Sequence, residues 1–143
     1  MPDRDIVLAK VGAIQRCLKR IRHVTGLDPN RLDEQDAQDI FVLNLQRAVQ
    51  STIDLATHVV ASEGLGMPDT IRGNFVLLEK AKIIPKTLSK KMESMVGFRN
   101  IAIQNYQTLD VDILKAILSK NLKGLEQFYA VLLIRFDLAK KKP

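Results

Sequence analysis

The sequence predicts an all-α protein, an up-and-down bundle of about five helices that forms a single domain over residues 1–143. Apolar residues recur at alternating steps of three and four along most of the chain, and no segment shows the two-residue alternation of a half-buried strand. The chain is 46% hydrophobic and has only seven glycines and five prolines, which suits one folded domain with its own core.

The first helix is predicted by one apolar stripe and by a signal at each end. Asp3 or Asp5 can cap its start, and Gly26 marks its end before a turn over residues 27–30. The residues of the stripe are Val7, Val11, Ile14, Leu18, Ile21 and Val24.

A second long helix is expected to start between Leu32 and Asp36 and to run to Glu63. Polar residues interrupt its stripe, so part of this helix is expected to meet another polar surface. The stripe is expected to comprise Ile40, Leu43, Arg47, Ile53 or Asp54, Leu55 and Val59, and the polar interruptions are Asn44, Arg47 and Asp54.

Breaks at residues 64–68 and 83–85 separate three further helices. Asp69 is expected to cap a short helix over residues 70–80, Pro85 fits the first turn of a fourth helix, and Asp110 caps a last long helix. The fourth helix should bury Leu88, Met92, Met95 and Val96, with Met67 as further core filler, and the last helix should bury a stripe from Ile113 to Phe136.

The net charge of +6 is concentrated toward the C-terminus. Residues 71–143 hold fourteen basic and six acidic side chains, which suits a polyanionic partner such as RNA, although lysines also simply solvate helix faces. No apolar run reaches the roughly 18 residues that a membrane span requires, and residues 1–5 are polar. A cytoplasmic protein without membrane contact is expected.

Neither a metal nor a cofactor is expected from the remaining residues. His23 and His58 each stand alone, without a second ligand at helical spacing. Gly64 and Gly66 lead into Met-Pro and not into the Lys-Ser or Lys-Thr of a phosphate loop, and the single cysteine, Cys17, is expected to be a buried thiol.

The run from Arg99 to Tyr106, Arg-Asn-Ile-Ala-Ile-Gln-Asn-Tyr, carries the functional information. Metal-independent RNA cleavage needs a proton acceptor for the ribose 2′-hydroxyl, a proton donor for the leaving 5′-oxygen, and positive charge beside the phosphate. Arg99 offers a fork of donors to phosphate, Asn100 can orient a partner, and Tyr106 can donate a hydrogen bond.

This run resembles the Arg-x4–6-His-x-Tyr signature of the HEPN ribonucleases, and within them the HepT toxins. The segments Asn44–Arg47 and Ile53–Ala56 also resemble the second helix of HepT proteins, so the likeness extends over nearly the whole chain. It implies a homodimer whose two motifs face one RNA cleft, with single-stranded RNA or tRNA as substrate.

The resemblance also implies a partner, the MNT-type nucleotidyltransferase antitoxin of a type VII-like toxin–antitoxin system. Such a partner transfers AMP to the motif tyrosine, here Tyr106. Arg47 and Asp54, seven residues apart, are expected to support the dimer interface or the motif, with a surface ion pair as the alternative. Lys86 and Lys90 are expected to face RNA.

The chain departs from the family at one position, where Gln104 replaces the histidine. Glutamine forms hydrogen bonds but does not titrate, and loss of a general acid or base typically costs about 10²- to 10⁴-fold in rate. Two functions therefore stay open, an impaired HEPN ribonuclease toxin and a non-catalytic helical dimer that binds RNA or a nucleotidyltransferase.

The spacing of the motif adds a geometric constraint. On one continuous helix, Arg99 and residue 104 point about 140° apart, whereas Arg99 and Tyr106 are only about 20° apart. Either the helix ends before residue 104, or two chains combine to form the site.

Overall fold

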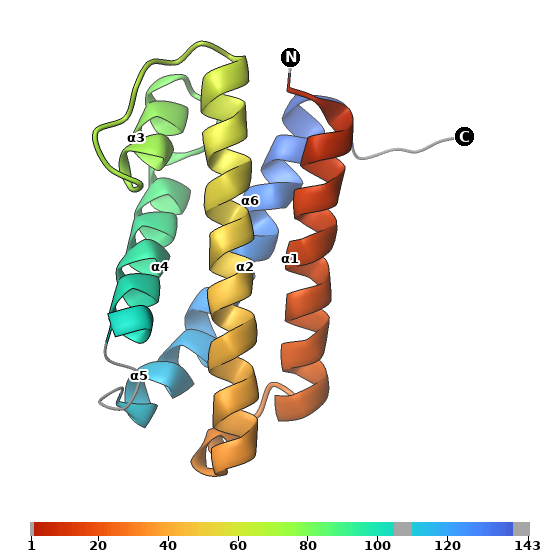
Figure 1. Cartoon of the computed structure of the whole chain (residues 1–143), viewed down its shortest axis with the longest axis vertical. Coiled ribbons are helices and arrows are strands. Elements are labelled where there is room, and N and C mark those ends of the chain that lie inside the picture. The colour runs from red at the N-terminus through yellow and green to blue at the C-terminus, as the bar shows by residue number, and fades with distance from the viewer. Residues whose placement is uncertain (1, 105–109, 139–143) are drawn as a thin grey trace.

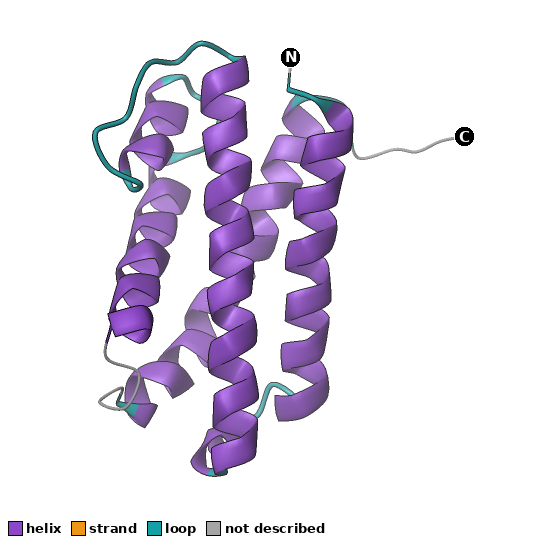
Figure 2. Ribbon diagram, in the orientation of Figure 1, coloured by secondary structure: helices purple, strands orange, loops and turns teal. Residues whose placement is uncertain are grey.

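The computed structural model describes residues 2–104 and 110–138, and over these residues the protein is an all-helical bundle without strands (Figures 1 and 2). The helices run alternately down and up the long axis, and α2 lies between α1 and α4. The predicted fold class is confirmed. The helices are α1 (Arg4–Thr25), α2 (Gln35–Ser62), α3 (Gly73–Lys80), α4 (Lys86–Gln104), α5 (Val111–Ala116) and α6 (Leu122–Arg135).

The ends of α1 follow the predicted capping chemistry. The Asp3 carboxylate accepts hydrogen bonds from the backbone N–H groups of Asp5 and Ile6, and Gly26 ends the helix at φ +60°. A 3₁₀ helix, Pro29–Asp33, then turns the chain into α2 and buries Leu32. The most extensive helix pairing in the bundle is that of α1 with α2.

Three predictions about the segment before α4 are wrong. The short helix α3 begins at Gly73 and not at residue 70, and its first turn carries no side-chain cap from Asp69. Thr70 takes that role in part, because its hydroxyl oxygen accepts a hydrogen bond from the Gly73 N–H at 3.1 Å. Met67 is 93% exposed rather than buried, because it lies in the loop outside the packed helices.

The expected last helix is interrupted. A π-helical segment, Ile117–Asn121, separates α5 from α6 and changes the rotation per residue, which shifts the apolar stripe around the axis. Ile117 and Leu118 are buried, but Ile113, expected to begin the buried stripe, is 50% exposed. The Asp110 cap is confirmed, since its carboxylate accepts the Asp112 N–H at 2.8 Å.

The core is continuous through the bundle and includes the predicted inner face of α4. Phe75 of α3 and Phe128 of α6 meet edge to face, with ring centroids 5.4 Å apart. In α2 the prediction is partly wrong: Leu43 is 45% exposed, because the helix buries a different stripe. The fully buried residues of that stripe include Phe41, Leu45, Ala48, Leu55, Ala56 and Val59. In the part of the chain that the structure describes, no helix is long and apolar enough to cross a membrane.

Candidate functional site at the C-terminal end of α4

Helix α4 continues through Arg99 and Asn100 and ends at Gln104. Of the two alternatives that the motif spacing left open, a helix that ends before residue 104 is therefore excluded. Ala102 anchors this last turn, since it is buried and lines a hollow together with Val42 of α2. Because the helix is unbroken, the side chains of Arg99 and Gln104 point about 140° apart. The two side chains of one chain therefore do not meet at one phosphate.

Arg99 is half-buried and held by its neighbour. Its Nη1 atom donates a hydrogen bond to Oδ1 of Asn100 at 3.0 Å. This bond uses one corner of the guanidinium fork and restricts its rotation, while Arg99 forms no ion pair with any described residue. A fixed guanidinium with donors to spare is suited to a phosphate oxygen.

Gln104 is exposed at the end of the helix, where its amide can donate and accept hydrogen bonds. Tyr106, the fourth predicted site residue, lies outside the described residues. The structure thus places Arg99, Asn100 and Gln104 on one helical turn and a half without bringing Arg99 and Gln104 together.

The rest of α4 presents positive charge outward. Lys86 and Lys90 are exposed as predicted, and α4 carries four basic residues against the single acid Glu93. Glu93 is half-buried and accepts a hydrogen bond from the hydroxyl of Ser89 at 3.0 Å, and four basic residues against this one acid leave α4 with a net positive charge.

Arg72 adds a further cation that the sequence analysis missed. Its guanidinium lies over Gly97, so close that a Cβ atom at that position would be 2.6 Å from Nη2. Gly97 is two residues before Arg99 on α4. The only sequence signal was a glycine in the middle of a helix, which marks a place where another group approaches the backbone closely.

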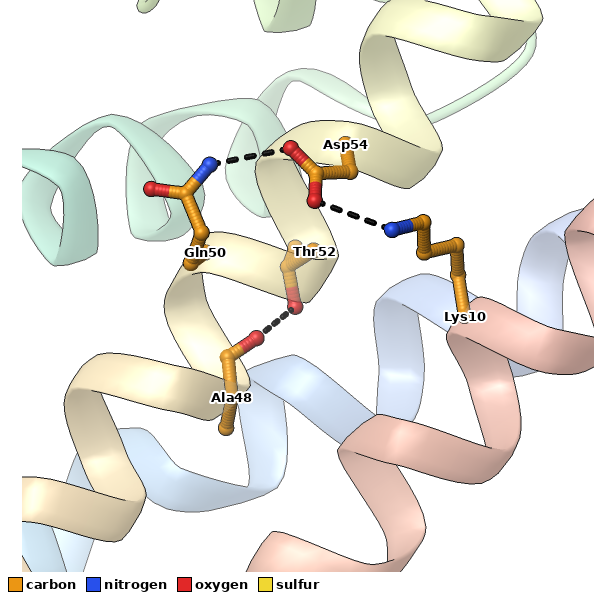
Figure 3. Close-up of polar contacts among 5 residues, drawn as sticks. All are labelled: Lys10, Ala48, Gln50, Thr52 and Asp54. Atoms are coloured by element: carbon orange, nitrogen blue, oxygen red, sulfur yellow. Dashed lines mark hydrogen bonds and ion pairs between the residues drawn. The ribbon is translucent and has the colours of Figure 1, made fainter.

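Arg47 and Asp54 do not form with each other the surface ion pair that was the alternative to a supporting role. Asp54 Oδ2 lies 3.1 Å from Nζ of Lys10, and Asp54 Oδ1 accepts a hydrogen bond from the Gln50 amide at 2.9 Å (Figure 3). Asp54 therefore ties α1 to α2, while Arg47 lines a groove elsewhere on α2.

That groove, the α1–α2 groove, has a volume of about 700 Å³ and is open to solvent. Arg16 and Arg20 of α1 face Arg47 of α2 across it; their spacing of four residues was the signal that the sequence analysis left unused. Cys17 lies on its wall and is half-buried. Burial raises the pKa of the Cys17 thiol, and the charges of Arg47 and Arg16 partly oppose that rise.

The two histidines lie apart, and one of them has a structural contact. His58 Nε2 accepts a hydrogen bond from the Asp3 backbone N–H at 2.9 Å, and His23 is exposed near the end of α1. Among the described residues, no group of three or more His, Cys, Asp or Glu side chains is arranged to hold a metal ion.

The chain is similar to known proteins over nearly all of its length. The family model described as ribonuclease HepT-like matches residues 14–132. A relative from Shewanella oneidensis, named mRNA nuclease HepT, is 38% identical over 128 residues, which are 90% of this chain and 96% of the relative.

Solved structures agree with this likeness. A chain of a toxin–antitoxin complex with AMP-PNP aligns with a TM-score of 0.85 and 37% identity over 91% of this chain and 98% of that chain. The tri-AMPylated Shewanella oneidensis HEPN toxin, in complex with MNT antitoxin, aligns with a TM-score of 0.85 and 38% identity over the same shares.

Proposed function

This chain belongs to the HepT-like ribonuclease family, and on that premise we propose that it is the toxin of a type VII-like toxin–antitoxin pair. Its activity is metal-independent endonucleolytic cleavage of RNA, and messenger RNA is the substrate class indicated by the relative's name. The observation that carries the proposal is the likeness, over nine-tenths of the chain, to toxins solved with their antitoxins.

The cleavage step follows from the groups on α4. The ribose 2′-oxygen attacks the adjacent phosphorus, the bond to the 5′-oxygen breaks, and a 2′,3′-cyclic phosphate and a 5′-hydroxyl result. Arg99 binds the phosphate oxygens as negative charge builds on them, and Asn100 holds the guanidinium in place. The family carries a histidine at position 104, which takes the proton from the 2′-hydroxyl or gives one to the leaving 5′-oxygen.

Gln104 limits this chemistry in the present chain. Its amide can hydrogen-bond the ribose hydroxyl or a phosphate oxygen, but it does not take up or release a proton near neutral pH. A slow ribonuclease is the result, with a rate about 10²- to 10⁴-fold below that of the histidine form.

The partner is a nucleotidyltransferase antitoxin of the MNT type, as in the solved complex of the Shewanella toxin. The acceptor on this chain is Tyr106. Its phenolic oxygen attacks the α-phosphorus of ATP, a phosphodiester to AMP forms, and pyrophosphate leaves. The attached phosphate adds negative charge beside Arg99 and Gln104, which repels RNA.

The working form is a homodimer, because Arg99 and Gln104 of one chain face different directions and a second chain supplies the missing group. Residues 1–143 act as one HEPN-like domain. The protein functions in the cytoplasm, where messenger RNA and ATP meet.

The test is to replace Gln104 by histidine and to follow cleavage of a single-stranded RNA and growth arrest of the host. Gln104→His should raise the cleavage rate at least 10²-fold, and adding Arg99→Ala should remove the gain. Gln104→Ala is the matched control, because it removes the amide without adding a titrating group. No gain from histidine in a folded dimer would contradict the ribonuclease site.

The alternative is a non-catalytic dimer that binds RNA or a nucleotidyltransferase. Gln104 itself favours it, since a binding surface needs hydrogen bonds and not proton transfer. RNA or antitoxin binding that persists in the histidine variant, without any cleavage, would support this second function.

A further inference from the structure

An arginine from outside α4 lies against the backbone of that helix. Arg72 directly precedes α3, and its guanidinium lies over Gly97 of α4. A Cβ atom at position 97 would be 2.6 Å from Nη2, so any residue larger than glycine would push the guanidinium away. Arg72 is exposed and forms no ion pair with another described residue, so its donors stay available to a further group.

The place that Arg72 occupies belongs to the face of α4 that carries position 104. Gly97 and Gln104 are seven residues apart, which is about 20° around the helix axis and about 10.5 Å along it. The exposed Lys90 and Lys86, seven and eleven residues before Gly97, also fall within about 20° of it. Arg72 thus fills the gap between the two lysines and Gln104, and we call this line of residues the α4 track.

One acid of α4 lies close to the track. Glu93 is about 40° from Gly97 around the axis, is half-buried, and accepts a hydrogen bond at 3.0 Å from the buried Ser89. Neither Glu93 nor Asp69, three residues before Arg72, forms an ion pair with Arg72. The track stays positive despite Glu93, because it has three cations: Lys86, Lys90 and Arg72.

A hollow of about 390 Å³ adjoins the track, and Gly97 belongs to both. Its walls are mostly apolar, with Ile101 of α4 and Ile113 of α5 exposed by 53% and 50%. The π-helical segment forms the opposite wall, and the side chain of its last residue, Asn121, forms no hydrogen bond with a described residue. An apolar hollow with one available amide suits a flat group that has a polar edge.

We infer that the α4 track and this hollow together bind one nucleotide of RNA next to the one that is cut. Arg72 and Lys90 hold its phosphates, and the hollow receives its base. A nucleotide combines these two chemistries, because its phosphate attracts cations and its base has apolar faces with a hydrogen-bonding edge. The base enters the hollow only when it is unpaired, so the RNA is single-stranded at this point.

The inference rests on the proposed function for the identity of the polyanion, but its tests measure binding. If the ribonuclease proposal fails, Gln104→His does not cleave RNA, whatever Arg72 binds. If the nucleotide site fails, RNA binding does not depend on Arg72, whatever the rate of cleavage.

A non-cleavable RNA tests the role of Arg72. A short single-stranded RNA with 2′-O-methyl riboses lacks the attacking hydroxyl, and its affinity is measured by fluorescence anisotropy at several salt concentrations. Arg72→Ala should weaken binding about tenfold and reduce the slope of log affinity against log salt by about 0.7, as expected for one lost phosphate contact on a single strand. Arg72→Lys should restore the slope but only part of the affinity, since lysine keeps the charge and lacks the fork of donors.

Arg4→Ala is the matched control for charge. Arg4 is an exposed arginine at the start of α1, at the opposite end of the bundle from the C-terminal end of α4, and its loss should change neither affinity nor slope (Figure 1). Unchanged RNA binding in Arg72→Ala would overturn the inference. RNA binding that stays intact while binding of the antitoxin is lost would assign the surface to a protein partner instead.

Gly97→Ala tests whether Arg72 acts from its place over α4. The added methyl group displaces the guanidinium, and alanine favours a helix more than glycine does, so the variant should fold. It should weaken RNA binding in the unaltered chain and add nothing in an Arg72→Ala background. Losses that add up in the double variant would show that the two residues act separately and would overturn the placement.

An abasic oligomer of the same length tests the hollow. Ile101→Ala should weaken binding of the RNA about threefold and leave binding of the abasic oligomer unchanged, because only a base enters the hollow. Arg72→Ala should weaken binding of both. Ile134→Ala is the matched control, since Ile134 is 74% exposed on α6. An equal loss for both oligomers in Ile101→Ala would contradict a base in the hollow.

Discussion

Arg99 and Gln104 lie five residues apart on the unbroken helix α4, and their side chains leave its axis about 140° apart. The motif of one chain therefore supplies only part of the proposed site. Helix geometry keeps these two side chains of one chain apart. The ribonuclease site proposed above, in which Arg99 binds phosphate and position 104 exchanges the proton, therefore needs two chains around one RNA.

Mixed dimers test whether each chain contributes one of the two groups to the proposed site. The unaltered chain has Arg99 but no histidine at position 104, and the double variant Arg99→Ala, Gln104→His has that histidine but no arginine at position 99. Each alone should cleave RNA at a background rate, and the co-refolded mixture should exceed both, because one chain supplies each group. Activity in the double variant alone would contradict the shared site, and so would a mixture no faster than its parts.

The Lys10–Asp54 ion pair between α1 and α2 should stabilise the fold only modestly. The two side chains are 37% and 38% exposed, and solvent screens their attraction, so Lys10→Ala should lower the free energy of unfolding by about 0.2–1 kcal/mol. Lys19→Ala is the matched control: Lys19 is exposed on α1 and has no ion pair with a described residue. Urea unfolding measures both, and a loss above about 2 kcal/mol would indicate a buried network.

Phe128 should contribute far more than any surface residue. Its ring is fully buried and contacts Phe75 edge to face at 5.4 Å. Phe128→Ala should therefore cost about 3–5 kcal/mol of unfolding free energy, since it removes the ring and leaves a cavity between α3 and α6. Ile134→Ala, on the exposed side of the same helix, should change stability by less than about 0.5 kcal/mol, and calorimetry would detect the difference.

Cys17 should make the fold less stable at alkaline pH. Burial raises the pKa of its thiol above the value in the unfolded chain. The contribution is fully present below the unfolded pKa of about 8.5 and is lost as the pH rises through the folded pKa, because the unfolded state releases its proton first. The stability of the natural chain relative to Cys17→Ala should be constant near pH 7 and should fall above pH ~8.5. A difference that does not change with pH would show that the thiol is not shifted.

The sequence predicted the local features well, because local chemistry determines them. The Asp3 and Asp110 caps, the glycine stop at residue 26 and the inner face of α4 all follow from interactions within a few residues. The motif residues Arg99 and Asn100 are also adjacent in the chain, and their hydrogen bond needs no tertiary contact.

Helix α2 shows where such prediction fails. It has two stripes at helical spacing, one through Phe41 and Leu45 and one through Ile40 and Leu43, and periodicity cannot tell which of them other helices cover. Contacts with α1, α3, α4 and α6 bury the first stripe and leave the second exposed. The ion pair of Asp54 with Lys10 was missed for the same reason, since Lys10 is 44 residues away.

By itself, then, the sequence determined the helical class, the ends of the helices and the identity of the motif, with Gln104 in the place of its titrating residue. Only the tertiary structure decided that α4 runs unbroken from Arg99 to Gln104, that a π-helical segment turns Ile113 outward, and that three arginines of α1 and α2 gather in one groove. The reason is physical: capping and periodicity act over one helical turn, whereas burial and the juxtaposition of charges depend on which helices pack together.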